Sequence, residues 1–224
     1  MPLDLARIQG LCFDVDGTLS DTDDAYVGRI ARALRPLRFL FRSGDPTRFS
    51  RWLVMASESP MNSLYYWADR MSLDDNVAHL FEWLARRRHP KKHFILMQGA
   101  DTLLPACAVR YPISVVSARD ESSTRRFLDQ FSLSTLFHNV VTSQTCEHTK
   151  PFPDPVLHSV EKMGLLPENC VMIGDTTVDI LAGKRAGAQT VGLLCGFGTE
   201  EELRKAGADV ILRDLAELKA ALQV

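Results

Sequence analysis

The chain lacks a disulfide pattern and a long apolar run. Its five cysteines are odd in number and form no C-x-x-C pair, and Cys12 and Cys170 fall inside apolar, strand-like stretches. We therefore interpret them as small buried hydrophobic residues of a reducing compartment. No apolar run approaches the length needed to cross a membrane, and no basic-then-apolar leader stands at the first residues. We expect a cytoplasmic protein with no membrane partner.

The chain also lacks an excess of charge of one sign. Its formal net charge is −2, which argues against nucleic acid as a stable partner, because such proteins usually present a basic face. Charge is nevertheless uneven, since residues 21–92 hold 13 Lys and Arg against 9 Asp and Glu. This basic segment could attract an anionic substrate, or it could be the solvated surface of helices. Both interpretations stay open.

Strand-like and helix-like segments alternate after about residue 91. This alternation predicts βαβ units and a Rossmann-like parallel sheet with helices on both faces, an α/β fold. Asp214 has the place and chemistry of an N-cap for the last helix. The predicted strands are 8–13, 113–117, 140–142, 171–173, 190–194 and 210–212, and helices are predicted near 127–131 and over 155–163 and 178–186.

Residues 22–92 do not follow this alternation. Leu73, Val77, Leu80 and Leu84 recur at helical spacing with polar residues between them. We predict that this segment is an inserted helical domain and that residues 1–21 and 93–224 form the core domain. Its aromatic residues, which include all three tryptophans, are expected to form a small core of their own; a box that stacks a substrate is the alternative.

Two short acidic stretches follow two of the predicted strands. Asp14 and Asp16 come after the first strand, and Asp175 and Asp179 come after the strand 171–173. If these strands are neighbours in one parallel sheet, the carboxylates meet at its carboxyl edge, where open α/β sheets bind ligands. Clustered carboxylates repel one another and suit a hard divalent cation, so we predict a Mg²⁺ site. Asp175 and Asp179 could instead be acids that stabilise a helix N-terminus.

The first acidic pair has the chemistry of phosphoryl transfer. An aspartate is ionised at neutral pH, so Asp14 can attack a phosphoryl group as a nucleophile once a cation offsets the charge repulsion. Asp16 could then protonate the leaving oxygen and later take a proton from the attacking water.

Two further residues are candidates for holding phosphate. Ser117 ends a strand before a helix, and Lys150 precedes a proline-rich turn that fixes its place, although each could also be an ordinary loop residue.

The stretch Asp14-Val15-Asp16-Gly17-Thr18, then Ser117, Lys150 and finally Gly174-Asp175-Thr176-Thr177-Val178-Asp179 resembles the haloacid-dehalogenase-like hydrolase superfamily. The glycine-containing stretches 187–192 and 207–209 are similar to its phosphoglycolate-phosphatase-like group. The resemblance implies a catalytic Asp14 nucleophile and Asp16 as general acid and base.

The resemblance also implies the ligands of the site. The phosphoryl group would be bound by Thr18, Ser117, Ala118 and Lys150. Mg²⁺ would be bound by the Asp14 carboxylate, the backbone carbonyl of Asp16, and Asp175, with Asp179 in support. The helical insertion lies where this superfamily places a cap that closes over the site.

One position departs from the group's pattern. Asn often follows the residue equivalent to Ser117, whereas this chain has Ala118 and then Arg119. Our hypothesis is that Arg119 reaches a second anionic group of the substrate.

These features predict a Mg²⁺-dependent phosphatase that acts on a small phosphorylated metabolite through an aspartyl-phosphate. A phosphomutase of the β-phosphoglucomutase type would keep the same carboxylates, and a non-catalytic binding module is a third hypothesis. A dehalogenase is disfavoured because its chemistry has no use for a metal pair or a leaving-group acid. The substrate and the oligomeric state stay open.

Overall fold

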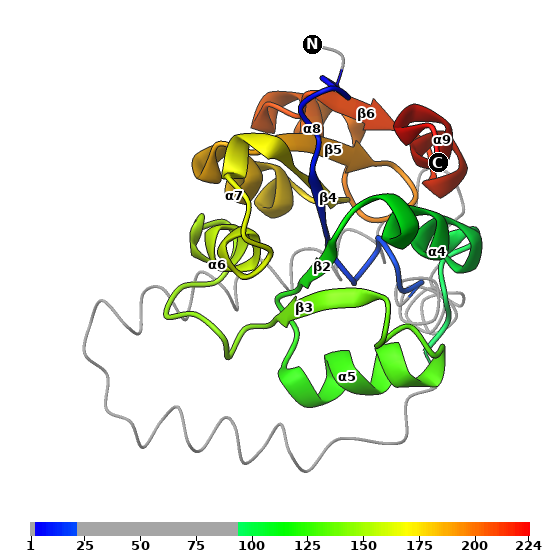
Figure 1. Cartoon of the computed structure of the whole chain (residues 1–224). Helices are drawn as coiled ribbons and strands as arrows, with labels where there is room; N and C mark the ends of the chain where they lie inside the picture. The colour runs from blue at the N-terminus through cyan, green and yellow to red at the C-terminus, as the bar shows by residue number, and fades with distance from the viewer. Residues whose placement is uncertain (1–2, 22–93) are drawn as a thin grey trace, which may run out of the picture. The chain divides into compact units, whose positions relative to one another are not determined.

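Residues 3–21 and 94–224, the part of the chain that this computed structural model describes, contain a six-stranded parallel sheet. Its strand order is β3-β2-β1-β4-β5-β6, and every pairing is parallel. Figure 1 shows the two halves of the sheet on either side of β1, the dark blue strand. The strands are β1 Gly10–Phe13, β2 Ile113–Val116, β3 Phe137–Val141, β4 Cys170–Gly174, β5 Gln189–Leu193 and β6 Val210–Leu212. The predicted parallel α/β fold is confirmed.

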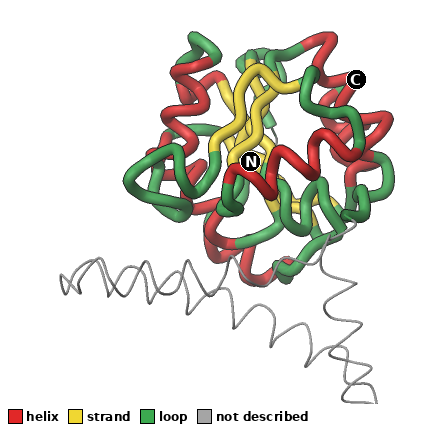
Figure 2. Tube along the Cα trace, turned by 90° about the horizontal axis from the view of Figure 1, so that it is seen from below, coloured by secondary structure: helices red, strands yellow, loops and turns green. Residues whose placement is uncertain are grey.

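Helices cover both faces of this sheet, as Figures 1 and 2 show. The buried side chains of α4, α5 and α9 pack against one face, and those of α6 and α7 pack against the other. Helix α8 contacts α7 and β6. The helices are α4 Ala100–Arg110, α5 Glu121–Gln130, α6 Asp154–Lys162, α7 Thr177–Ala186, α8 Glu200–Ala206 and α9 Leu215–Leu222, with a short 3₁₀ turn over Pro167–Asn169.

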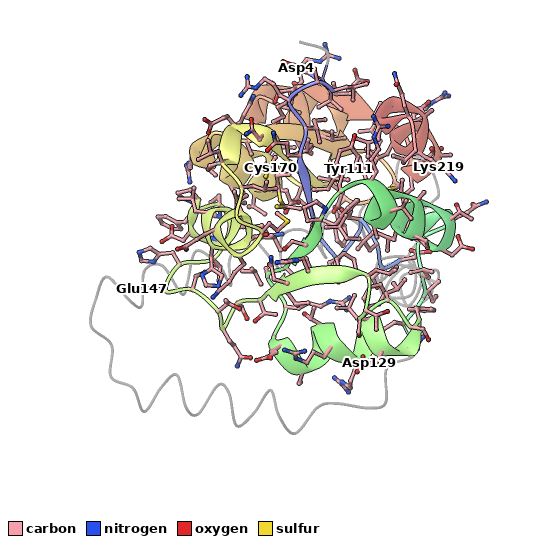
Figure 3. The ribbon with its side chains drawn as sticks, in the orientation of Figure 1. Asp4, Tyr111, Asp129, Glu147, Cys170 and Lys219 are labelled. Carbon is pink, nitrogen blue, oxygen red and sulfur yellow. The ribbon has the colours of Figure 1, made fainter. Side chains whose placement is uncertain are left out.

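The alternation of side chains along the central strands builds both cores. Leu11 and Phe13 of β1 point into the cluster with α4, α5 and α9, whereas Cys12 points into the cluster with α6 and α7. Cys170, labelled in Figure 3, joins the second cluster from β4. All these side chains are fully buried, and since neighbours along a strand face opposite sides, a strand covered on both faces has to be apolar throughout.

Most element boundaries match the predicted ones within a few residues. Asp214 caps α9 as predicted, because its side chain accepts a hydrogen bond from the Glu217 backbone. The sequence analysis predicted neither α4 nor α8. Helix α8 is short and buries only Leu203, and α4 has Pro105 inside it and an exposed Val109. The buried residues of α4 recur at helical spacing, but its other face also carries apolar residues, so no polar face marks the helix in sequence, and α8 buries a single side chain.

The predicted helical insertion, residues 22–92, lies outside the described residues, and the domain division stays a prediction. Within the described ranges, no helix is long and apolar enough to span a membrane. The described residues belong to one compact unit. Its carboxyl edge is where β1, β2 and β4 end side by side, at Phe13, Val116 and Gly174.

Asp209, in the chain before β6, forms an ion pair with Lys184 of α7 and accepts hydrogen bonds from Thr190 of β5. The Asp209 carboxylate accepts hydrogen bonds from the Thr190 backbone (2.9 Å), the Thr190 hydroxyl (3.0 Å) and Lys184 Nζ (2.6 Å). Burial alone would raise the pKa of Asp209, but the hydrogen bonds from Lys184 and Thr190 lower it below its ordinary value. Its charged form is therefore stabilised in the folded state.

We expect Asp209→Ala to lower the free energy of unfolding by about 1.5–3 kcal/mol at pH 7, the usual range for hydrogen bonds to a charged group. Because the folded pKa is lowered, this contribution is present above the unfolded pKa of 3.8 and is lost as pH falls through the folded value. Urea unfolding at pH 7 and pH 3 measures it. The control is Glu147→Ala, an exposed residue on the loop between β3 and α6 (Figure 3). If Asp209→Ala loses as much free energy of unfolding at pH 3 as at pH 7, the charged form of Asp209 does not provide the stabilisation.

Candidate active site

Three buried carboxylates meet at the carboxyl edge of the sheet. Asp14 follows β1, Asp175 follows β4, and Asp179 lies in the first turn of α7. One oxygen of each lies within 4.8 Å of the others, and all three residues are buried. The backbone N–H of Asp14 donates to the carbonyl of Ile173 in β4 at 2.9 Å, which keeps the loop after β1 against the neighbouring strand. The predicted convergence of these acids is present in the structure.

Lys150 lies between two of these carboxylates. Its Nζ donates to Asp14 Oδ1 at 2.5 Å, to Asp179 Oδ1 at 2.6 Å and to the carbonyl of Val116 at 2.9 Å. The side chain is 3% exposed. An ammonium has three hydrogen-bond donors, and all three of these partners lie at the same edge of the sheet. Lys150 therefore joins the ends of β1, β2 and α7 through one buried charge.

The burial of this cluster shifts its ionisation. Burial raises the pKa of Asp14 to about 7, with smaller upward contributions from Asp179 and Asp16 and an opposing one from Lys150. Burial also raises the pKa of Asp175 well above its usual range, and Asp179 and Asp14 raise it further. Burial alone would lower the pKa of Lys150, but the two carboxylates beside it raise it above the ordinary lysine value. The ammonium of Lys150 is thus held firmly in its charged form, whereas burial and mutual repulsion disfavour the charged forms of Asp14 and Asp175.

Asp175 is enclosed by the chain on several sides. Its Oδ1 accepts from the Thr18 hydroxyl at 2.9 Å, and its Oδ2 accepts from the Phe197 backbone N–H at 2.8 Å. Gly17 has a φ of +79°, and a Cβ there would lie 2.3 Å from Asp175 Oδ2. A Cβ on Gly196 would lie 2.1 Å from the same oxygen. Only glycine permits such a close approach of backbone to the carboxylate.

Asp179 combines two functions that the sequence analysis treated as alternatives. Its Oδ2 accepts from the backbone N–H of Thr176 at 3.0 Å and from the Thr176 hydroxyl at 2.6 Å. Its Oδ1 accepts from Lys150. Asp179 is therefore an acid at a helix N-terminus, as the simpler hypothesis held, and it also belongs to the carboxylate cluster.

The carboxylate of Asp16 is held by Arg119 and is not one of the three clustered acids. Nε of Arg119 donates to Asp16 Oδ2 at 2.5 Å, and the NH2 group of Arg119 donates to Oδ1. The Asp16 side chain is 29% exposed, which makes it the most open of the four acids. The suggested role of its backbone carbonyl as a metal ligand stays a prediction.

The predicted phosphate-binding residues have distinct contacts. Ser117 is buried, accepts from the Arg119 backbone N–H at 3.1 Å, and donates its own N–H to Val141 at 2.9 Å. Ala118 is exposed beside it. Thr18 contacts Asp175, as described above. That Thr18, Ser117, Ala118 and Lys150 bind phosphate stays a prediction.

Two backbone N–H groups at the start of α5 bond to other parts of the chain. The Asp120 side chain accepts from the Ser123 backbone N–H at 2.9 Å, and the Glu121 N–H donates to the Gln144 side chain at 3.1 Å. These two donors of the first turn are therefore already used by oxygens of the chain.

The donor set of the cluster fits a divalent cation. Carboxylate oxygens are the ligands that Mg²⁺ prefers, and three carboxylates converge here while the ammonium of Lys150 contacts only two of them. Buried like charges are costly unless a cation compensates them. Asp14, Asp175 and Asp179 are the side chains that would hold it.

Comparison with known proteins assigns the chain to a family. The family model for haloacid dehalogenase-like hydrolases matches residues 11–193. The chain belongs to this family. The match begins in β1 and ends at the last residue of β5, so it covers Asp14, Asp16, Lys150, Asp175 and the strands that carry them.

Several curated relatives align over nearly their whole length. A phosphoglycolate phosphatase of Shigella boydii is 27% identical over 235 residues, which cover 96% of this chain and 92% of the relative. A pyrophosphatase of Bacillus pumilus is 26% identical over 219 residues, which cover 96% of both chains. Among solved structures, a haloacid dehalogenase-like hydrolase of Streptococcus pneumoniae has a TM-score of 0.70 at 21% identity and covers 96% of this chain and 98% of its own.

The sequence analysis missed part of the surroundings of the site. It did not identify the Phe197 N–H, the close approach of Gly196, or the ion pair between Arg119 and Asp16. The stretch Gly196-Phe197-Gly198, which begins three residues after the end of β5, could have indicated a loop that approaches a ligand or a carboxylate closely.

We predict that Lys150→Met lowers the free energy of unfolding by about 3–5 kcal/mol in EDTA, because it leaves buried carboxylates without their cation. The control is Lys205→Met, which removes an exposed lysine paired with Glu201 on α8, and it should cost at most about 0.5 kcal/mol. Denaturant unfolding with matched baselines measures both. Similar losses in the two variants would contradict the described role of Lys150.

Gly196→Ala should weaken Mg²⁺ binding about tenfold to a hundredfold, because the new Cβ would lie 2.1 Å from Asp175 Oδ2 and must displace this carboxylate. Isothermal titration calorimetry measures the affinity. Gly207→Ala serves as the control: Gly207 has φ +93°, so the substitution strains the backbone, but its Cβ would meet nothing closer than 3.9 Å and nothing of the site. Equal affinity in both variants would show that the position of Asp175 does not determine cation binding.

Proposed function

We propose that the protein is a Mg²⁺-dependent phosphatase that hydrolyses a small phosphorylated metabolite through an aspartyl-phosphate on Asp14. The observation that carries the proposal is the cluster of three buried carboxylates around Lys150 at the carboxyl edge of the sheet. Membership of the hydrolase family and the phosphatase names of the relatives support it.

In the first half of the reaction, Asp14 attacks the phosphorus and Asp16 protonates the leaving oxygen. A bound Mg²⁺ would supply positive charge that offsets the repulsion between the attacking carboxylate and the phosphoryl oxygens. Lys150 already contacts Asp14 and adds a second positive charge beside the transferred group. Ser117 and Ala118 would hold the phosphoryl oxygens from the end of β2, with Ser117 as the hydroxyl donor and Thr18 on the opposite loop.

In the second half, water hydrolyses the aspartyl-phosphate. Asp16 takes a proton from the water, the water oxygen bonds to phosphorus, and the bond from phosphorus to Asp14 breaks. The carboxylate of Asp16 is the most exposed of the four acids, which suits a group that exchanges protons with a leaving group and with water. Residues 22–92 would close over the site as the cap.

The substrate class is a small phosphate ester or a pyrophosphate. Relatives of nearly equal similarity are phosphoglycolate phosphatases and a pyrophosphatase, so both compounds belong in the first screen. We propose a cytoplasmic location, which the five unpaired cysteines support.

We predict that wild-type protein releases inorganic phosphate from phosphoglycolate or p-nitrophenyl phosphate in Mg²⁺ and not in EDTA. Asp14→Asn should lower kcat at least about 10⁴-fold while the melting temperature stays at or above that of wild type in EDTA, because an amide is a poor nucleophile and carries no buried charge. A malachite-green phosphate assay and a thermal melt measure these.

Three results would contradict the proposal. Phosphate release that persists in EDTA would exclude the cation. Substantial activity in Asp14→Asn would exclude Asp14 as the attacking group. Conversion of a sugar phosphate to an isomer without phosphate release would identify the protein as a phosphomutase.

A further inference from the structure

A two-point ion pair fixes the direction of the Asp16 carboxylate. Arg119 Nε and its NH2 group donate to different oxygens of Asp16. A single hydrogen bond leaves a carboxylate free to rotate about it, whereas a guanidinium that binds both oxygens fixes the position and the plane of the group. The orientation of Asp16 in this structure is therefore set by Arg119.

Aromatic rings hold Arg119 itself in place. Its guanidinium carbon lies 5.1 Å from the ring centre of Phe94 and 5.8 Å from that of Phe127. These two rings pack edge to face with centres 5.7 Å apart. The backbone N–H of Arg119 donates to Ser117 Oγ, and the side chain is 11% exposed. A guanidinium packed in this way is oriented before any substrate arrives.

Phe94 is anchored in turn to α5. The Gln130 side chain accepts from the Phe94 N–H at 3.2 Å and donates to the Phe94 carbonyl at 2.8 Å. The residues that follow Phe94 pair with the loop that carries Asp16, because the Met97 N–H donates to the carbonyl of Leu19 at 2.8 Å. The support of Arg119 is thus continuous with the loop of the acid that it binds.

We propose that Arg119 is a positioning residue, which holds Asp16 in the orientation from which it takes the proton of the attacking water. This inference rests on the proposed phosphatase function. In the step concerned, the water oxygen bonds to phosphorus, the phosphorus–oxygen bond to Asp14 breaks, and the proton moves to an oxygen of Asp16. Arg119 acts through Asp16 and does not bind the substrate. The earlier hypothesis of a contact with a second anionic group becomes an outcome of the test.

The experiment compares Arg119→Met and Arg119→Lys on two substrates, p-nitrophenyl phosphate and phosphoglycolate, of which only the second carries another anionic group. We expect Arg119→Met to lower kcat by about tenfold to a hundredfold on both substrates, the effect of losing a bidentate charged hydrogen bond. KM should stay within about threefold on both, since the residue does not bind substrate. Arg119→Lys should have a higher kcat than Arg119→Met, because lysine keeps the positive charge although it cannot bind both oxygens of Asp16 as a planar guanidinium does.

Arg125→Met is the matched control. Arg125 lies on α5, six residues along the chain, and forms an exposed pair with Glu121. Its loss should change kcat less than about twofold, as expected for a surface ion pair. Thermal melts show whether each variant folds. If Arg119→Met does not fold, Arg119→Lys is compared with the wild-type protein alone, and we expect it to have a reduced kcat on both substrates.

A double substitution separates positioning from a structural role. If Arg119 acts through Asp16, adding Arg119→Met to Asp16→Asn should lower kcat for p-nitrophenyl phosphate by less than about threefold further, because the acid that it positions is already lost. If Arg119 had only a structural role, adding Arg119→Met to Asp16→Asn would lower kcat by the same factor as Arg119→Met does in the wild-type protein.

Two other results would overturn the inference. A higher KM for phosphoglycolate alone, with kcat unchanged, would make Arg119 a substrate-binding residue. Unchanged kcat in Arg119→Met on both substrates would leave it no catalytic role. Failure of the phosphatase proposal is a different result, namely no Mg²⁺-dependent phosphate release by wild-type protein from either ester.

Discussion

The contact between one buried ammonium and two buried carboxylates is the constraint on which the site depends. Lys150 bonds Asp14 and Asp179 at the edge of the sheet, and Asp175 lies beside them without a cation of its own among these contacts. Charges removed from water in this way are tolerated only when partners compensate them. We propose that a divalent cation binds at this edge beside Lys150, where its charge would offset the repulsion between Asp14 and an anionic phosphoryl group.

The fold provides the rigidity that this arrangement requires. Parallel strands β1, β2 and β4 end at one edge, so that residues distant in sequence are placed by the backbone pairing of the sheet. Hydrogen bonds from the Thr18 hydroxyl and the Phe197 N–H then fix Asp175, and glycines allow the backbone to approach it. The four acids consequently differ in their surroundings. Three lie buried in the cluster, whereas Asp16 is partly exposed and held by Arg119.

The sequence predicted the parts that follow from local patterns. Apolar strands that end in acids indicated the sheet edge, and they brought Asp14, Asp175 and Asp179 together correctly because parallel strands share their carboxyl end. The contacts that depend on the path of a loop could not be predicted in this way. Nothing in the residues around Arg119 indicates that its side chain crosses to Asp16, since that contact depends on where Phe94 and Phe127 place the guanidinium. Helix α8 was missed because a short helix that buries one side chain leaves no apolar stripe.

The central claim is that the phosphoryl group rests on Asp14 between two displacements. Each in-line displacement inverts the configuration at phosphorus, so two in succession restore it. The most direct test is the stereochemical course of transfer, measured with a phosphorothioate ester made chiral at phosphorus by two oxygen isotopes and hydrolysed by the wild-type protein in water that carries the third, so that the released thiophosphate is itself chiral. The account predicts overall retention of configuration. Overall inversion would mean that water attacks the substrate directly, and it would contradict the role assigned to Asp14.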